Sequence, residues 1–181
     1  MPLSCWSYLL GLICLLFGGF VLAKPEVAAR ALNALPRNAV AGFVLSTLAW
    51  VWAGYAVYCI DIDFLNPYKH VLLFALFACI PLTWFWMDNL LPCRALGGIL
   101  TLFPYELLHA ARHHPSPWRL ALVVFAYAAI IKGMVFILYP WKMRQMIVWA
   151  TKSPLLFRAF GAVEAVLGAL FIALGATALR V

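Results

Sequence analysis

Two ionisable residues inside long apolar stretches are the first candidates for chemistry. Lys132 interrupts the apolar stretch 120–138, and Glu164 lies nine residues inside the stretch 155–179. A charge in the interior of a membrane-spanning helix costs about 2.5–3.5 kcal/mol on insertion scales, so it normally faces protein and has a partner. The rise of a helix places Lys132 roughly 9 Å and Glu164 roughly 14 Å from the same membrane face. We therefore predict a buried charge pair.

This charge pair has two interpretations. In the functional one, the two residues relay a proton or an ion, or make a polar contact with a partner helix. In the structural one, they form an internal salt bridge, and Lys132 extends partly toward the headgroups. We favour the structural interpretation.

A second group of residues has the spacing of metal ligands on a helix. Glu106, His109 and His113 stand at positions i, i+3 and i+7, which share one helical face. Zinc and iron sites in helical bundles use carboxylate and imidazole ligands of this kind. However, the run carries Arg112 and ends in Pro-Ser-Pro at 115–117, which is typical of a solvated membrane border. We favour the border interpretation and predict no cofactor.

Signatures of known catalytic classes do not occur in the sequence. It contains no GxSxG, HExxH, P-loop or GxGxxG motif, which makes an enzyme the less favoured class. The cysteines are scattered without a CxxC pair, so we predict neither a disulfide nor a metal site for them: Cys5, Cys14, Cys59, Cys79 and Cys93.

The composition indicates that lipid surrounds these residues. Of the 181 residues, 67% are apolar and only 10% are charged, whereas soluble domains are about half apolar and a quarter charged. This excludes a secreted disulfide scaffold, a disordered tail and a nucleic-acid-binding module. The net charge of +7 fits basic loops that stay on the cytoplasmic side and meet anionic headgroups.

Five apolar stretches are long enough to cross a bilayer, which needs about 20 residues per helix. We therefore expect an all-α polytopic membrane protein with five or six transmembrane helices. Amphipathic linker helices at 26–35 and 141–151 are expected to lie in the membrane interface. The five stretches are 3–23, 39–60, 71–87, 120–138 and 155–179.

The segment 90–111 is the ambiguous one. Its prolines, Pro92 and Pro104, and its charges leave a short broken span, a re-entrant segment or an interfacial helix as alternatives. If it crosses, the basic residues divide eight to four between the two sides, and otherwise seven to five. The stronger asymmetry favours six crossings with both termini outside.

The two ends of the chain share a pattern. Gly18 precedes Pro25 by seven residues, and Gly133 precedes Pro140 by seven, each ahead of a short helical stretch and a second span. We expect a single integral membrane domain, 1–181, with repeat units 3–60 and 120–179 and an irregular middle at 61–119. The alternative is that two basic loops between spans resemble each other by chance, and both interpretations stay open.

The C-terminal third, about 120–179, resembles a known family. Leu138-Tyr139-Pro140, Trp141-Lys142, Lys152-Ser153-Pro154 and Arg158-Ala159-Phe160-Gly161 are similar to the small bacterial inner-membrane proteins of the YjeT kind. That family has two spans joined by a basic interfacial segment and no established activity. The sequence departs from it at Lys132-Gly133, where Glu-Gly is expected, and at Glu164, where the family is apolar. The resemblance implies an accessory protein of the bacterial inner membrane and transfers no catalytic residue.

Two functions from different classes remain. The favoured one is a non-catalytic accessory or assembly subunit that packs against other membrane subunits, or against its own copies, in the lipid bilayer. Its interface would use small residues on the last span. The alternative is a small transporter or lipid-processing enzyme that uses Lys132 and Glu164. The interface candidates are Gly161, Ala165, Gly168 and Arg158.

Overall fold

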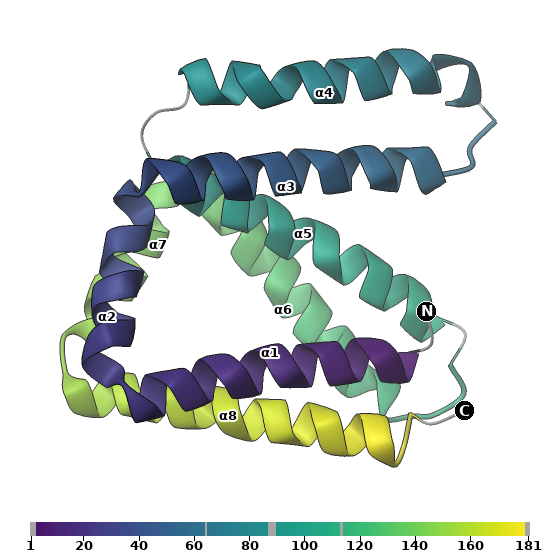
Figure 1. Ribbon diagram of the computed structural model, residues 1–181. Helices are drawn as coiled ribbons and strands as arrows, with labels where there is room; N and C mark the ends of the chain where they lie inside the picture. Colours follow the sequence, from purple (N-terminus) through teal and green to yellow (C-terminus); the bar gives the residue numbers. More distant parts are fainter. Residues whose placement is uncertain (1–2, 64, 87–89, 113, 180–181) are drawn as a thin grey trace. The chain divides into compact units, whose positions relative to one another are not determined.

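The computed structural model describes residues 3–63, 65–86, 90–112 and 114–179. Over these residues the chain forms helices and no strand (Figure 1). Short 3-10 turns lie at Leu35–Arg37 and Asn66–Tyr68. The α-helices are α1 (Leu3–Ala23), α2 (Pro25–Ala34), α3 (Ala39–Cys59), α4 (Lys69–Trp86), α5 (Leu91–Arg112), α6 (Arg119–Leu138), α7 (Pro140–Thr151) and α8 (Pro154–Ala176).

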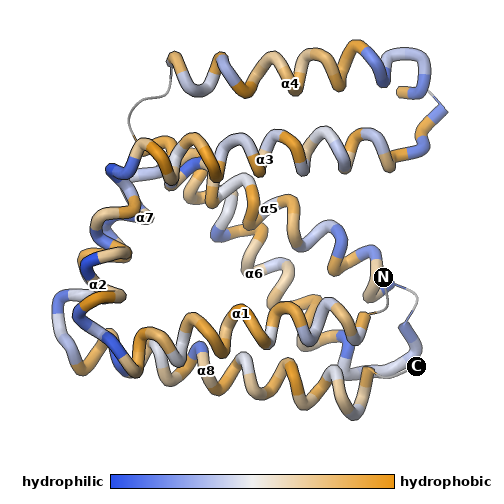
Figure 2. Tube along the Cα trace, in the orientation of Figure 1, coloured by the Kyte–Doolittle hydropathy of each residue, from blue (hydrophilic) through white to orange (hydrophobic). Residues whose placement is uncertain are grey.

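Five of these helices are long and apolar enough to cross a membrane, as the sequence predicts. They are α1, α3, α6, α8 and the segment Asn66–Trp86, which contains α4. Figure 2 shows apolar residues along their lengths and hydrophilic residues gathered on α2 and at the helix ends. At 1.5 Å per residue each helix matches the roughly 30 Å hydrocarbon core. The chain is an all-α integral membrane protein.

The ends of several helices follow from their cap residues. Pro25, Pro140 and Pro154 open α2, α7 and α8, because the fixed φ of proline suits a first helical position whose N–H would have no helical partner. Asn38 caps α3, and its side-chain oxygen accepts the Ala41 N–H at 3.2 Å. The two expected linker segments are helical, as α2 and α7, and their place in the membrane interface stays a prediction.

The middle of the chain is more regular than predicted. The segment 61–119 holds α4 and α5, and α5 is one continuous helix of 22 residues. Of the alternatives left open for this segment, a broken helix is not observed, because α5 continues through Pro104, whose side chain is fully buried. A proline removes one hydrogen bond, and helix packing can offset that loss in a membrane protein. Whether α5 crosses the bilayer stays a prediction, because it is not among the five most apolar helices.

The chain divides into two compact units. Unit 1 comprises Met1–Ala34, Phe103–Ala129 and Arg144–Val181, and unit 2 comprises Leu35–Leu102 and Ile130–Met143. Each unit takes residues from both predicted repeats, 3–60 and 120–179. The compact units therefore do not follow the repeat boundaries, and the repeat stays a prediction.

Unit 1 is organised around α1 and α8, which lie side by side (Figure 1). Near the start of α1, the second half of α5 and the first half of α6 join them in one apolar core. Two edge-to-face aromatic pairs link these helices: Trp6 with Phe103 at 5.3 Å and Phe125 with Phe171 at 5.1 Å between ring centroids. The buried core residues are Leu3, Leu10, Leu107, Ala111, Leu122, Ala126, Phe171 and Leu179.

The linker helices attach to the other end of the α1 and α8 pair. Ala28 of α2 packs in a smaller buried cluster with Val21 of α1 and Phe157 of α8. The side chain of Asn33 donates a hydrogen bond to the Thr151 hydroxyl at 3.1 Å, which joins the end of α2 to the end of α7. Helix α2 is thereby held to α1 and α8 and is joined to the end of α7.

Unit 2 contains α3, α4, the first half of α5 and the end of α6. Helices α3 and α4 pack along each other, and the Trp84 indole N–H donates to the buried Ser46 hydroxyl at 3.2 Å. Gly97 of α5 and Gly133 of α6 bring their helices into backbone contact. These two pairs form the walls of the cavity described below.

Candidate functional site

The predicted interface residues of the last span face α1 of the same chain. A Cβ built on Gly161 would stand 2.7 Å from Val21, and one on Gly168 would stand 2.6 Å from the Leu15 nitrogen. Ala165 lies in the same contact, since its nitrogen is 2.6 Å from the position a Cβ of Gly18 would take. The small-residue face of α8 that was expected to bind a partner therefore packs against α1 of the same chain.

We call Gly11, Gly18, Gly161 and Gly168 the glycine seam. The glycines are seven residues apart on each helix, and seven residues are close to two helical turns, so each pair lies on one face. Gly11 meets Gly168 and Gly18 meets Gly161, so the two helices run antiparallel. Small residues at this spacing let backbones approach closely, which is how helices associate in lipid.

Arg158, the fourth interface candidate, is the fifth residue of α8. Its side chain is exposed. This position places a basic group near the polar linker that precedes α8, and its role in binding a partner stays a prediction.

The predicted charge pair is distributed over the two units. Lys132 belongs to unit 2 and has an exposed side chain, whereas Glu164 belongs to unit 1 and is partly buried. Within unit 1 the Glu164 carboxyl lies next to the thiol of Cys14 on α1. The sequence therefore identified a carboxyl that faces protein, and its pairing with Lys132 stays a prediction.

The candidate metal ligands lie near the C-terminal end of α5. Glu106 is partly buried and His109 is exposed, with its ring 6.4 Å from that of Tyr105. His113 lies outside the described residues. Among the residues that are described, no three His, Cys, Asp or Glu side chains gather where they could hold a metal ion. All five cysteines are free thiols.

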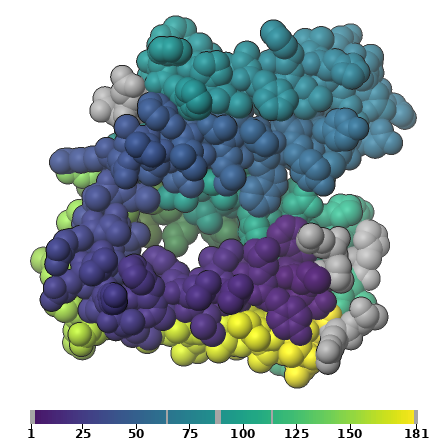
Figure 3. Space-filling model, in the orientation of Figure 1, coloured from purple at the N-terminus to yellow at the C-terminus, as the bar shows by residue number. Residues whose placement is uncertain are grey.

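Helix α4 packs differently from the other apolar helices. All of its residues are described, and none of them is buried, whereas 17–33% of the residues are buried in the other four candidate spans. On the face shown in Figure 3, α4 lies along α3 and the rest of its surface is open. The most exposed side chains are aromatic, with Phe85 and Trp86 each 81% exposed.

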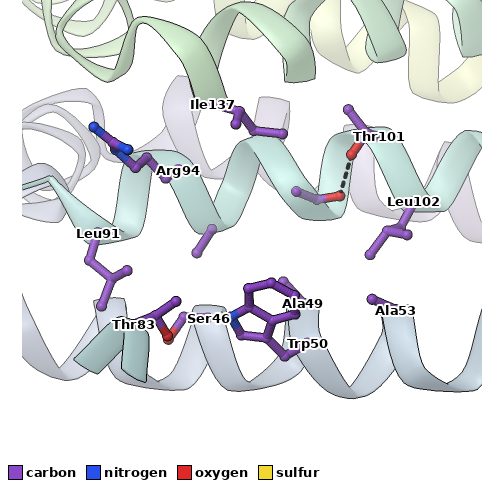
Figure 4. Close-up of a pocket in the computed structure, with 12 residues that line it drawn as sticks. Ser46, Ala49, Trp50, Ala53, Thr83, Leu91, Arg94, Thr101, Leu102 and Ile137 are labelled. Carbon is purple, nitrogen blue, oxygen red and sulfur yellow. Dashed lines mark hydrogen bonds between the residues drawn. The ribbon is translucent and has the colours of Figure 1, made fainter. Parts of the chain in front are cut away.

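An apolar cavity of about 370 Å³ lies inside unit 2 (Figure 4). The α3 wall is formed by Ser46, Ala49, Trp50 and Ala53, and the α5 wall runs from Leu91 to Leu102. Thr83 of α4 and Ile137 of α6 complete the lining. Small side chains on the two facing helices leave this space, because they do not reach across it.

Arg94 is the charged residue in the lining of this cavity. Its Nε is buried and has no hydrogen-bond partner among the described residues. Figure 4 shows Arg94 at the same end of the cavity as Leu91, with its guanidinium group turned away from α3. In the sequence Arg94 entered only the count of basic residues; its position three residues into a helix that continues through apolar residues was the signal for a site.

Comparison with family models, with curated proteins and with solved structures finds no match to this chain.

Proposed function

We propose that this protein is a non-catalytic subunit of a larger membrane assembly and that α4 is the helix that contacts the partner. The resemblance of the segment 120–179 to the YjeT kind of protein supports the bacterial inner membrane as its location. The partner is a transmembrane helix of another membrane protein or of a second copy of this chain.

The observation that carries the proposal is that none of the residues of α4 is buried. A helix in a polytopic membrane protein usually buries one face against its neighbours through close van der Waals packing. Helix α4 buries no residue, although the segment Asn66–Trp86 that contains it is long and apolar enough to cross a membrane. A partner helix would supply the missing face.

The surface beside α4 supports the same proposal. Between α3 and α4 lies a shallow apolar groove of about 450 Å³, with Trp84 on the α4 side. Its α3 side consists of Phe43, Val44, Thr47, Leu48 and Val51. Because the glycine seam is occupied by α1 and α8, the α3–α4 hairpin is the better candidate for an intermolecular contact.

Photo-crosslinking in native membranes tests the proposal. Benzoylphenylalanine is placed at Phe74 of α4, which is 77% exposed, and at Val166 of α8, which is 66% exposed. We expect ultraviolet light to link position 74 to a protein chain, identified by mass spectrometry, and position 166 to lipid. Native mass spectrometry of the protein purified in a mild detergent should then show the same chain in a fixed ratio.

Two results together would contradict the proposal. In the first, both positions form adducts with lipid alone. In the second, the protein purified from native membranes is a single copy without any other chain. Either a second copy or a different protein at position 74 agrees with the proposal and names the partner.

The cavity in unit 2 is the observation that favours the alternative, a small transporter or lipid-processing enzyme. That function would use Lys132 and Glu164, so Lys132→Ala and Glu164→Ala, made singly, should each abolish uptake or turnover while the fold stays intact. If each change lowers only the stability, and the double change Lys132→Met with Glu164→Leu restores it, the pair is structural and the alternative fails.

A further inference from the structure

The cavity of unit 2 is suited to a hydrocarbon chain. Four of its lining residues are Ala or Gly, and they lie on the facing sides of α3 and α5: Ala49, Ala53, Ala95 and Gly98. A cavity with apolar walls stays dry and takes up apolar molecules of matching size. In a bilayer the apolar molecule at hand is an acyl chain. A volume of about 370 Å³ holds a substantial length of such a chain.

The hydroxyl groups of the lining do not offer donors to a ligand. Thr101 donates to the carbonyl of Gly98 at 2.8 Å, and Ser46 donates to that of Phe43 at 3.1 Å. Thr83 donates to the carbonyl of Ile80 at 2.8 Å. A polar ligand would therefore find few hydrogen-bond donors between α3 and α5, and only the end of the cavity near Arg94 carries a charge.

Arg94 is partly buried, and its Nε has no partner among the described residues. A buried donor without a partner costs about 1–3 kcal/mol, and more when the group is charged. Among the described residues, the ion pair within 4.0 Å is Glu26–Arg30, so no described carboxylate neutralises Arg94. The planar guanidinium group matches carboxylate and phosphate oxygens and binds them through two parallel hydrogen bonds.

The charge and the cavity together restrict the ligand. A neutral hydrocarbon would fill the space and leave Arg94 unpaired, and a free phosphate would pair with Arg94 and leave the space empty. A molecule with an anionic head and an acyl chain satisfies both, because Arg94 and Leu91 lie at one end of the cavity and Leu102 lies at the other (Figure 4). The guanidinium group is turned away from α3, so the head would lie beyond that end of the cavity and the chain between the helices.

We propose that unit 2 binds an anionic lipid, with one acyl chain between α3 and α5 and the carboxylate or phosphate head on Arg94. This inference goes beyond the proposed function and does not depend on it, since no partner helix takes part in holding the lipid and α4 contributes only Thr83 to the described lining.

Native mass spectrometry of the full chain tests the head-group contact. The protein is released from detergent micelles that contain phosphatidylglycerol, phosphatidylcholine or oleate. We expect the wild type to retain one anionic lipid at least about ten-fold more tightly than phosphatidylcholine. Arg94→Gln should remove this preference, since losing a charged hydrogen bond of about 1.5–3 kcal/mol corresponds to a ten-fold or greater loss of affinity. Arg94→Lys keeps the charge and should keep part of the preference.

The chain contact is tested by filling the cavity. Ala53→Leu places extra side-chain atoms into the space, whereas Ala56→Leu adds the same atoms to α3 at a partly buried position outside the lining. We expect Ala53→Leu to weaken anionic lipid binding and Ala56→Leu to leave it unchanged. Phosphatidylglycerol with brominated chains should quench Trp50, and Trp50→Phe should remove that part of the quenching, because Trp50 lines the cavity.

Three outcomes decide the inference. Retention of phosphatidylglycerol but not oleate, or the reverse, supports it and identifies the head as phosphate or carboxylate. Equal binding of phosphatidylcholine, or unchanged selectivity in both Arg94→Gln and Arg94→Lys, overturns the head-group assignment. Equal binding by Ala53→Leu and Ala56→Leu overturns the assignment of the cavity. Size-exclusion profiles that match the wild type confirm that each variant is folded.

Discussion

Gly18 of α1 and Gly161 of α8 lie so close that a Cβ on Gly18 would stand 2.6 Å from the Gly161 carbonyl oxygen. The same relationship recurs seven residues away, where a Cβ on Gly11 would stand 2.7 Å from the carbonyl oxygen of Gly168. Atoms do not approach to these distances without moving, so the first and last spans need glycine at these positions. The contact joins residues that are far apart in the sequence, and it packs the first and last spans together within unit 1.

Alanine at Gly18 should destabilise the protein although alanine favours a helix. The added methyl group meets the backbone of α8, which cannot rotate away as a side chain can. Overpacking of this kind costs about 1–3 kcal/mol. We expect Gly18→Ala to lower the melting temperature in detergent, measured by circular dichroism.

The neighbouring glycine is a matched control for this change. A Cβ on Gly19 would meet nothing within 4 Å, and it lies in the same helix. Gly19→Ala should be neutral or should stabilise by up to about 1 kcal/mol through its helix propensity. If Gly18→Ala and Gly19→Ala melt at the same temperature, the close approach of α1 and α8 is not needed for stability.

A second glycine contact in unit 2 gives a parallel prediction. A Cβ on Gly97 would stand 2.8 Å from the Gly133 carbonyl oxygen, and one on Gly133 would stand 2.7 Å from that of Gly97. We expect Gly97→Ala and Gly133→Ala each to destabilise by about 1–3 kcal/mol, measured by unfolding in detergent.

Gly98→Ala is the control for the α5 and α6 contact, because its Cβ would make an ordinary 3.6 Å contact with Ala49. The double change of Gly97 and Gly133 to Ala should cost less than the sum of the single changes, since the first already separates the two helices. Additive costs would mean that the two glycines act independently and would argue against a shared contact.

Hydropathy and proline positions predicted most of the architecture. The five spans and the linker helices α2 and α7 lie close to the predicted boundaries, because lipid imposes length and composition on each span separately. The continuity of α5 was missed because Pro104 is a local break signal, whereas its acceptance depends on packing by other helices. Local sequence does not contain that information.

The glycine seam and the cavity of unit 2 were predicted only in part, because both depend on contacts between helices. Glycine spacing identifies a face of α8, but it does not say which helix covers that face, and α1 of the same chain does so. The cavity exists because small residues on α3 stand opposite small residues on α5, two helices that are not neighbours in the sequence. Residue patterns along one helix describe neither relationship.

A buried hydroxyl links the two helices of the seam and gives a third prediction. Ser7 of α1 donates a hydrogen bond of 2.6 Å to the carbonyl oxygen of Phe171 on α8. Hydrogen bonds between membrane helices contribute about 0.6 kcal/mol on average and at most about 1.7 kcal/mol. We expect Ser7→Ala to lower the stability by about 1 kcal/mol in a detergent unfolding titration.

Thr177 is the matched control for Ser7, because its hydroxyl donates only within its own helix segment, to the Ala173 carbonyl at 2.7 Å. Thr177→Val keeps the side-chain shape and should change the stability by less than Ser7→Ala does. Equal effects would show that the Ser7 bond adds nothing to the association of α1 with α8.

The side chain of Arg119 donates hydrogen bonds at the C-terminal end of α5, and this contact gives the last prediction. Its Nη1 lies 3.3, 3.1 and 2.8 Å from the carbonyl oxygens of Ala111, Arg112 and His114, at and just beyond the end of α5, where helical carbonyls run out of N–H partners. The Ala111 carbonyl also accepts the His114 N–H at 3.3 Å. We expect Arg119→Met to cost about 1.5 kcal/mol, at the lower end for bonds to a charged group because the side chain is only partly buried. Hydrogen–deuterium exchange should speed up in the last turn of α5.

Arg112→Met, at an exposed side chain, is the control and should leave this exchange unchanged. Unaltered exchange in Arg119→Met would show that α5 ends there without help from this arginine.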